Sequence, residues 1–188
     1  PSFPSPPVPP STLALALRPT ADDLANPALH PFRPRHFLFT SAGSVLRRST
    51  SLDIDDDLLE RVIDLNLKGT FYGMQAVLPH MLANKFGVIV NMGSMSHRRG
   101  GPGTSVHYAA AKGAVVTMTM GVAREFATQG IRCLSISPGP IRTPFQDSAN
   151  SSPELLQRFV DDVPMKRFGK AEESRNWCCS CVRTPANL

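Results

Sequence analysis

The sequence predicts an α/β fold in which short buried strands alternate with long helices. Val88, Ile89 and Val90 form an apolar β-branched run bounded by glycines, which is typical of a buried strand. From Tyr108 onward the chain is rich in alanine and helical in pattern. A second long helical pattern precedes the strand, over residues 55–84. Strands that alternate with helices of this length form a parallel sheet, and its ligands bind beyond the carboxyl ends of the strands.

The first half of the chain contains an irregular segment, a strand and a helix. Ten of the 18 prolines fall within residues 1–34, which show no sustained helical or strand period, so we expect an irregular, partly polyproline II segment. Residues 36–40, HFLFT, predict a strand. Residues 55–84 predict one helix, because three aspartates suit its N-terminus and a broad apolar stripe follows.

The second half repeats the alternation. We expect a strand over residues 87–91, a glycine-rich loop over 92–103, a helix over 105–128 and a strand over 131–137. Residues 144–169 predict a mobile lid that contains a helix over 153–160. Residues 174–188 predict a frayed tail.

Three reactive side chains follow the central strand. Tyr108 and Lys112 are four residues apart and therefore share one face of a helix. A free tyrosine has a pKa of about 10, and a neighbouring cation lowers it by favouring the phenolate. We therefore expect Lys112 to lower the pKa of Tyr108, which then acts as a general acid/base. Ser94, at the end of the strand, can hold a substrate oxygen.

Other segments surround this trio in a recognisable order. They are SAG at 41–43, DLNLKGTF at 64–71, VNMGS at 90–94, YAAAKGA at 108–114 and SPGPIRT at 137–143. Together these segments resemble the short-chain dehydrogenase/reductase family over roughly residues 37–173, and most of all its glucose dehydrogenase and 3-oxoacyl-carrier-protein reductase branch. Ser94 aligns better with the family serine than Ser96 does.

The resemblance implies a fold and an activity. The fold is a partial Rossmann-like doubly wound parallel sheet over residues 36–173, after an irregular segment over 1–35 and before an unrelated tail over 174–188. The activity is hydride transfer between NAD or NADP and a small-molecule alcohol or ketone. The implied catalytic residues are Asn66, Ser94, Tyr108 and Lys112. The implied cofactor-binding residues are Ala42, Gly43, Tyr108, Lys112, Pro138, Gly139, Ile141 and Thr143. The family also implies a homodimer or homotetramer built through the two long helices.

One family motif is missing from the sequence. The glycine-rich Thr-Gly-x-x-x-Gly-x-Gly turn, whose backbone N–H groups receive the cofactor pyrophosphate, does not occur. We therefore hypothesise a truncated member that binds cofactor weakly, and an inactive dimerising fragment is the alternative function. A serine hydrolase using Ser94 with His97 or His107 is a remote third reading, because no Gly-x-Ser-x-Gly elbow is present.

The composition of the chain argues against several classes of binding partner. The formal charge of +5 is dispersed, with no long basic run and no aromatic interleaving, so we expect no nucleic acid partner. We expect three basic pairs to be solvated surface, with contact to the phosphates of a dinucleotide as the lesser alternative, and they are Arg47-Arg48, Arg98-Arg99 and Lys166-Arg167. No apolar run reaches membrane-spanning length, and we expect a cytoplasmic protein. The four cysteines lack the spacing of a zinc site, so no metal is expected.

Overall fold

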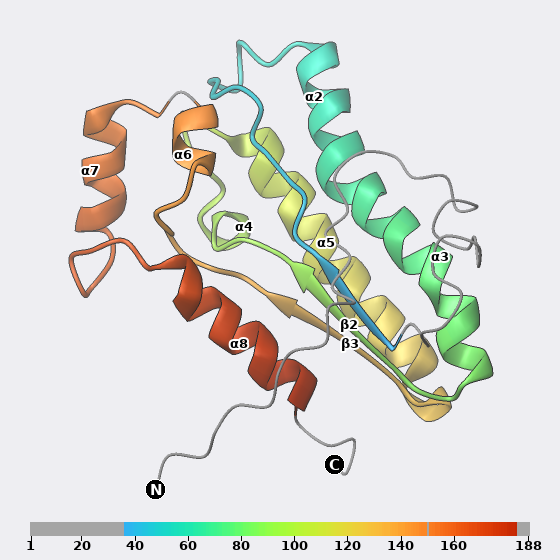
Figure 1. The fold of residues 1–188 in the computed structure, drawn as a ribbon. Helices are drawn as coiled ribbons and strands as arrows, with labels where there is room; N and C mark the ends of the chain where they lie inside the picture. The colour runs from blue at the N-terminus through green and yellow to red at the C-terminus, as the bar shows by residue number, and fades with distance from the viewer. Residues whose placement is uncertain (1–35, 150, 184–188) are drawn as a thin grey trace, which may run out of the picture.

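The computed structural model describes residues 36–149 and 151–183, which form a three-stranded parallel sheet with helices packed around it (Figure 1). The strand order is β1-β2-β3, where β1 is Phe37–Thr40, β2 is Gly87–Met92 and β3 is Ile131–Ile136. Phe37 pairs with Val88, and Gly87 pairs with Ile131. The three predicted strands and the parallel α/β class are therefore confirmed. The segment predicted to be irregular, residues 1–35, lies outside the described residues.

The connection from β1 to β2 is one long helix with a widened turn at Asn66. It runs as α2 Asp56–Ile63, a π-helical segment Asp64–Lys68 and α3 Gly69–Ala83. Asp55 caps the N-terminus, because its carboxylate accepts from the Leu58 N–H at 2.8 Å. The Asn66 amide donates to the Val62 carbonyl at 2.9 Å and to the Ser44 carbonyl at 2.8 Å. The predicted helix is confirmed in extent, and its interruption places a buried amide beside the loop after β1.

The connection from β2 to β3 passes through a short helix α4, Ser96–Arg99, and the long helix α5, Val106–Phe126. The chain then turns at Gly130, whose φ of 81° is in the left-handed region. A Cβ at this position would lie 2.0 Å from the Lys85 carbonyl oxygen, so only glycine fits where the two loops meet. After each connection, the next strand therefore runs parallel to the preceding one.

The core lies between the sheet and the helices α3 and α5. Its buried apolar residues come from all three strands and from α3, and they are Leu38, Met74, Val77, Met81, Ile89, Ile131 and Cys133. A buried polar cluster crosses the same layer. The Thr40 hydroxyl donates to Asn91 Oδ1 at 2.8 Å, and Asn91 Nδ2 donates to the Thr119 hydroxyl at 3.0 Å. These bonds join β1, β2 and α5 in one hydrogen-bonded layer, which satisfies buried polar groups that would otherwise be costly.

Three helices follow β3, and the last of them departs from the sequence-based expectation. They are α6 Phe145–Ser148, α7 Pro153–Asp161 and α8 Ala171–Arg183. The predicted lid helix is confirmed as α7. The expectation of a frayed tail was wrong for residues 174–183, because α8 continues through them and packs against β2 and β3 (Figure 1). Half-buried side chains on its inner face, among them Cys178 and Cys179, account for this packing.

None of the helices in the described part of the chain has the length and hydropathy needed to cross a bilayer.

Candidate active site

A cavity of about 1570 Å³ opens at the carboxyl ends of the strands. Most of the residues singled out from the sequence line it, although they come from four separate segments. These lining residues are Gly43, Ser94, Tyr108, Lys112, Pro138, Gly139, Ile141 and Thr143. Ala42 and Asn66 are not among the lining residues. The parallel sheet brings the others together because each follows a strand or begins the helix after it.

Ser94 and Tyr108 lie close together at the cavity. Both residues line it, and the serine hydroxyl is near enough to the phenol to lower the pKa of Tyr108. The Ser96 hydroxyl and the Ser96 N–H both donate to Ser94 Oγ, at 2.9 and 3.2 Å. Of the two serines, Ser94 is therefore the one that acts on the phenol, and Ser96 orients the Ser94 hydroxyl through these two hydrogen bonds.

Burial controls the protonation of Tyr108. It raises the pKa of the phenol, while the hydrogen bond with Ser94 and the nearby Arg48 guanidinium oppose this rise. The expected lowering of the Tyr108 pKa is not found, because burial raises this pKa overall and Lys112 is not among the groups that lower it. The phenol keeps its proton at neutral pH and is ready to donate it.

Lys112 is a buried ammonium beside the tyrosine ring. Its side chain is only 2% exposed, and Nζ lies 5.8 Å from the centre of the Tyr108 ring. Nζ donates to the Met92 carbonyl oxygen at 2.8 Å. Burial lowers the pKa of Lys112 to about 8, because a charged amine is poorly solvated there. This explains why the cation influences the phenol less than the spacing in the sequence suggested.

Gly43 and Asn66 form a tight wall next to Lys112. A Cβ on Gly43 would lie 2.6 Å from Asn66 Oδ1 and 2.9 Å from Lys112 Nζ. Asn66 is fully buried, and its Oδ1 has no hydrogen-bond partner among the described residues. An unpaired buried oxygen costs free energy unless a ligand or a water reaches it. The missing side chain of Gly43 leaves room for such a group.

The turn after β3 is held in place from two sides. The Pro138 carbonyl accepts from the Met95 N–H at 2.9 Å, which ties the turn to the loop after β2. Ile141 forms a parallel bridge with Gly169, and the Arg142 N–H donates to the Gly169 carbonyl at 2.9 Å. The wall of this part of the cavity is therefore formed by main chain that these hydrogen bonds hold in place.

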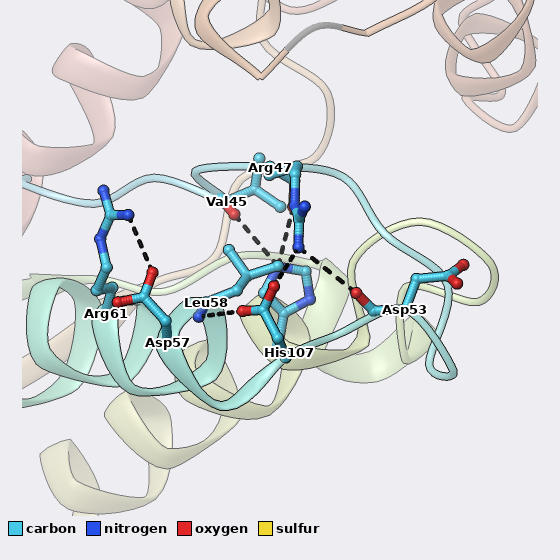
Figure 2. A network of polar contacts seen from close by, with 8 residues as sticks. Val45, Arg47, Asp53, Asp57, Leu58, Arg61 and His107 are labelled. Atoms are coloured by element: carbon cyan, nitrogen blue, oxygen red, sulfur yellow. Dashed lines mark hydrogen bonds and ion pairs between the residues drawn. The ribbon is translucent and has the colours of Figure 1, made fainter.

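The roles of two residues were not found from the sequence, although both residues were noted there. Arg48, expected to be solvated, is half-buried and lines the cavity, because α6 and α7 cover it. His107, next to the catalytic candidate Tyr108, is 2% exposed, and its Nε2 donates to the carbonyls of Val45 and Arg47 at 3.2 and 3.1 Å (Figure 2). Neither residue belongs to a local pattern, and both owe their roles to segments far away in the sequence.

The two histidines do not provide a base for Ser94. His97 Nδ1 contacts the Ser94 carbonyl oxygen at 2.5 Å, and His107 faces carbonyl oxygens of the loop after β1. Across the residues that the structure covers, neither imidazole is hydrogen-bonded to the Ser94 hydroxyl. This arrangement does not support nucleophilic catalysis by the serine.

Comparison with known families matches residues 18–183 to the family described as enoyl-(acyl carrier protein) reductase. A 2-(R)-hydroxypropyl-CoM dehydrogenase of Xanthobacter autotrophicus is 40% identical over 114 residues, which are 61% of this chain and 45% of that protein. The chain spans about half the length of the curated relatives it matches.

Two solved structures share the fold. The NAD⁺-bound xylitol dehydrogenase superposes with a TM-score of 0.77 at 26% identity, over 88% of this chain and 70% of that one. The structure of ElxO with NADP bound gives a TM-score of 0.79 at 25% identity, over 89% of this chain and 68% of that one.

Proposed function

Since this chain belongs to the short-chain dehydrogenase/reductase family, we propose that it interconverts a secondary alcohol and a ketone with NAD or NADP. The observation that carries the proposal is that Ser94, Tyr108 and the buried Lys112 line the same cavity, with the two hydroxyl groups close together. A neutral phenol beside a second hydroxyl can bind a carbonyl oxygen and protonate it.

The proposed roles follow from the atoms that face the cavity. In ketone reduction, the Ser94 hydroxyl and the Tyr108 phenol both donate to the substrate oxygen, and Tyr108 transfers its proton to that oxygen as the carbonyl carbon gains a hydride. The raised pKa of Tyr108 keeps this proton in place before the reaction. In alcohol oxidation the same proton returns to the phenolate. The negative charge on the tyrosine oxygen is then stabilised by the guanidinium of Arg48. Lys112 Nζ lies 5.8 Å from the centre of the same ring.

The residues present fit the nicotinamide end of a dinucleotide. Gly43 leaves space against Lys112 Nζ and the unpaired Asn66 oxygen, so hydroxyl groups of a ribose or a water can be accepted there. The residues that would hold the nicotinamide and its phosphates are Ala42, Gly43, Tyr108, Lys112, Pro138, Gly139, Ile141 and Thr143. When bound, the cofactor supplies or accepts the hydride. Asn66 would hold the water that links Lys112 to solvent.

A homodimer or homotetramer would use the outer surfaces of the two long helices. Three large apolar side chains are between 43% and 50% exposed there, and they are Phe71, Tyr72 and Met120. Exposed apolar side chains on neighbouring helices favour association. Sedimentation velocity of the purified chain tests this part of the proposal. The cytoplasmic location stays a prediction, which fractionation of expressing cells tests.

The activity is tested with the two tyrosines of the chain. A panel of aliphatic and cyclic ketones is offered with NADH or NADPH, and consumption of the reduced cofactor is followed by absorbance. Tyr108→Phe is expected to lower turnover by a hundredfold or more, since general acid catalysis contributes roughly 10²–10⁴-fold. Tyr72→Phe, at an exposed position on α3, is the matched control and keeps full activity.

Cofactor binding is measured separately by the fluorescence of the reduced cofactor. Binding without any turnover by the wild-type chain would contradict the proposed reaction and favour the inactive dimerising fragment. Equal losses in the two tyrosine variants would contradict the role of Tyr108.

A further inference from the structure

Arg48 differs from the other arginines around the cavity. Four arginines line it, namely Arg48, Arg99, Arg158 and Arg175. Three of them are exposed, and Arg99 is already paired with Asp162 at 2.9 Å. Arg48 is half-buried and lies close enough to Tyr108 for the two groups to influence each other electrostatically. It is therefore the one of these four arginines that is both partly buried and in electrostatic contact with Tyr108.

Neutral partners hold the guanidinium in place. Nε donates to the Ser151 hydroxyl at 2.9 Å, and Nη2 donates to Gln146 Oε1 at 3.3 Å. The Phe159 ring lies against the guanidinium, with its centre 5.3 Å from Cζ. Among the side chains that the structure describes, which do not include those at 147, 148 and 150, no carboxylate pairs with Arg48. The neutral partners orient its charge without neutralising it, and donors remain for a further acceptor.

The loop that carries Arg48 is fixed to helix α5. The His107 ring donates to the carbonyls of Val45 and Arg47, on either side of the bend (Figure 2). The Ser49 N–H donates to the Thr104 carbonyl at 3.0 Å. Leu46, between these anchors, has a φ of 58°, a left-handed conformation that a leucine adopts only when its surroundings hold it there. The position of Arg48 is therefore set by the fold and not by solvent.

A partly desolvated cation without a carboxylate favours an anionic ligand. We propose that Arg48 binds the carboxylate of an oxo acid or hydroxy acid whose ketone or alcohol oxygen lies on Ser94 and Tyr108. This inference rests on the proposed function, and it names the class of substrate for that same site. Arg48 is then a specificity-determining residue. His107 holds the loop that carries Arg48, and α6 and α7 contact the guanidinium. These contacts place Arg48 at the end of the substrate opposite to its ketone or alcohol oxygen.

The experiment compares three oxo acids of increasing length with their neutral methyl esters. The probes are 3-oxobutanoate, 4-oxopentanoate and 5-oxohexanoate, titrated into the full chain without cofactor and followed by NMR. The wild type is expected to bind at least one acid roughly tenfold more tightly than its ester, the usual effect of a hydrogen bond to a charged group. Arg48→Met is expected to reduce this preference to about one, whereas Arg98→Met, at an exposed arginine that does not line the cavity, leaves it unchanged. A ratio measured within one variant cancels differences in its folded fraction.

Two further measurements test whether charge or packing causes the preference, and whether Arg48 binds a substrate carboxylate or a cofactor phosphate. Arg48→Lys keeps the charge and is expected to retain part of the preference, which shows that charge and not packing is responsible. Titration with NADPH is expected to give the same affinity in the wild type and in Arg48→Met. Weaker NADPH binding together with an unchanged acid preference would assign Arg48 to a cofactor phosphate and overturn the proposal. Equal binding of acid and ester by the wild type would also overturn it. Because no turnover is needed, the preference can hold even where the proposed reaction fails.

Discussion

Lys112→Met is expected to remove the gain in stability that the protein shows between pH 7 and pH 9. Lys112 is 2% exposed, and burial lowers its pKa from 10.5 to about 8. Between these two values the unfolded chain binds more protons than the native one, so stability rises with pH. From pH 7 to pH 9 the native amine loses its proton while the unfolded amine keeps it, and the resulting gain is about 1 kcal/mol.

Cys133 acts in the opposite direction and must be included. Burial raises the pKa of its thiol from 9.0 to about 12, so the native state keeps a proton that the unfolded state begins to release. This lowers stability from pH 7 to pH 9 by less than the gain from Lys112. The wild type should therefore gain stability over this range, and Lys112→Met should lose a little.

Urea unfolding at pH 7 and pH 9, followed by circular dichroism, measures both changes. Lys170→Met, which removes an exposed amine, is the control and should follow the wild type. At pH 7 Lys112→Met should itself be more stable than the wild type, because it removes a buried charge. The same pH response in the wild type and in Lys112→Met would refute the reasoning, since it would mean that Lys112 titrates near its ordinary value.

Two further substitutions test the geometry around the site. Gly43→Ala places a Cβ 2.6 Å from Asn66 Oδ1 and 2.9 Å from Lys112 Nζ, so we expect a loss of about 1–3 kcal/mol in unfolding free energy and weaker binding of NADH by fluorescence titration. Unchanged NADH affinity in a folded variant would contradict the cofactor role of this wall. Asn91→Leu leaves the buried Thr40 hydroxyl without its acceptor and should cost about 1–3 kcal/mol in urea unfolding. Adding Thr40→Val should recover part of that loss, and no recovery would contradict the assignment to this bond.

Much of the fold could be predicted from local patterns. Three sequence signals act over only a few residues, namely the β-branched run at Val88, the acidic residues at Asp55 and the proline that begins the lid helix. The strand and the two helices that they predict are present in the structure. The spacing of Tyr108 and Lys112 fixed their common helix face for the same reason. The π-helical turn at Asn66 lies within the predicted helix, and its cause is a side-chain bond to the main chain four residues earlier.

The electrostatics of the site depend on tertiary packing and could not be read from spacing. Lys112 was expected to act on the phenol as a charged neighbour. The structure buries its amine against the Met92 carbonyl and lowers its pKa to about 8. Tyr108 is likewise governed by burial, and the cation that opposes this effect is Arg48. Desolvation depends on everything packed around a group, so adjacency along a helix does not determine it.

The sequence by itself determined the three strands, the two long helices and the lid helix, the order in which they occur and the reactive trio of Ser94, Tyr108 and Lys112. These features arise from interactions within one or two turns of the chain. Only the tertiary structure decided that Arg48 lies in the cavity, that His107 anchors its loop and that α8 covers the sheet. The reason is physical, because burial and hydrogen-bond partners are supplied by segments that meet only after the chain has folded.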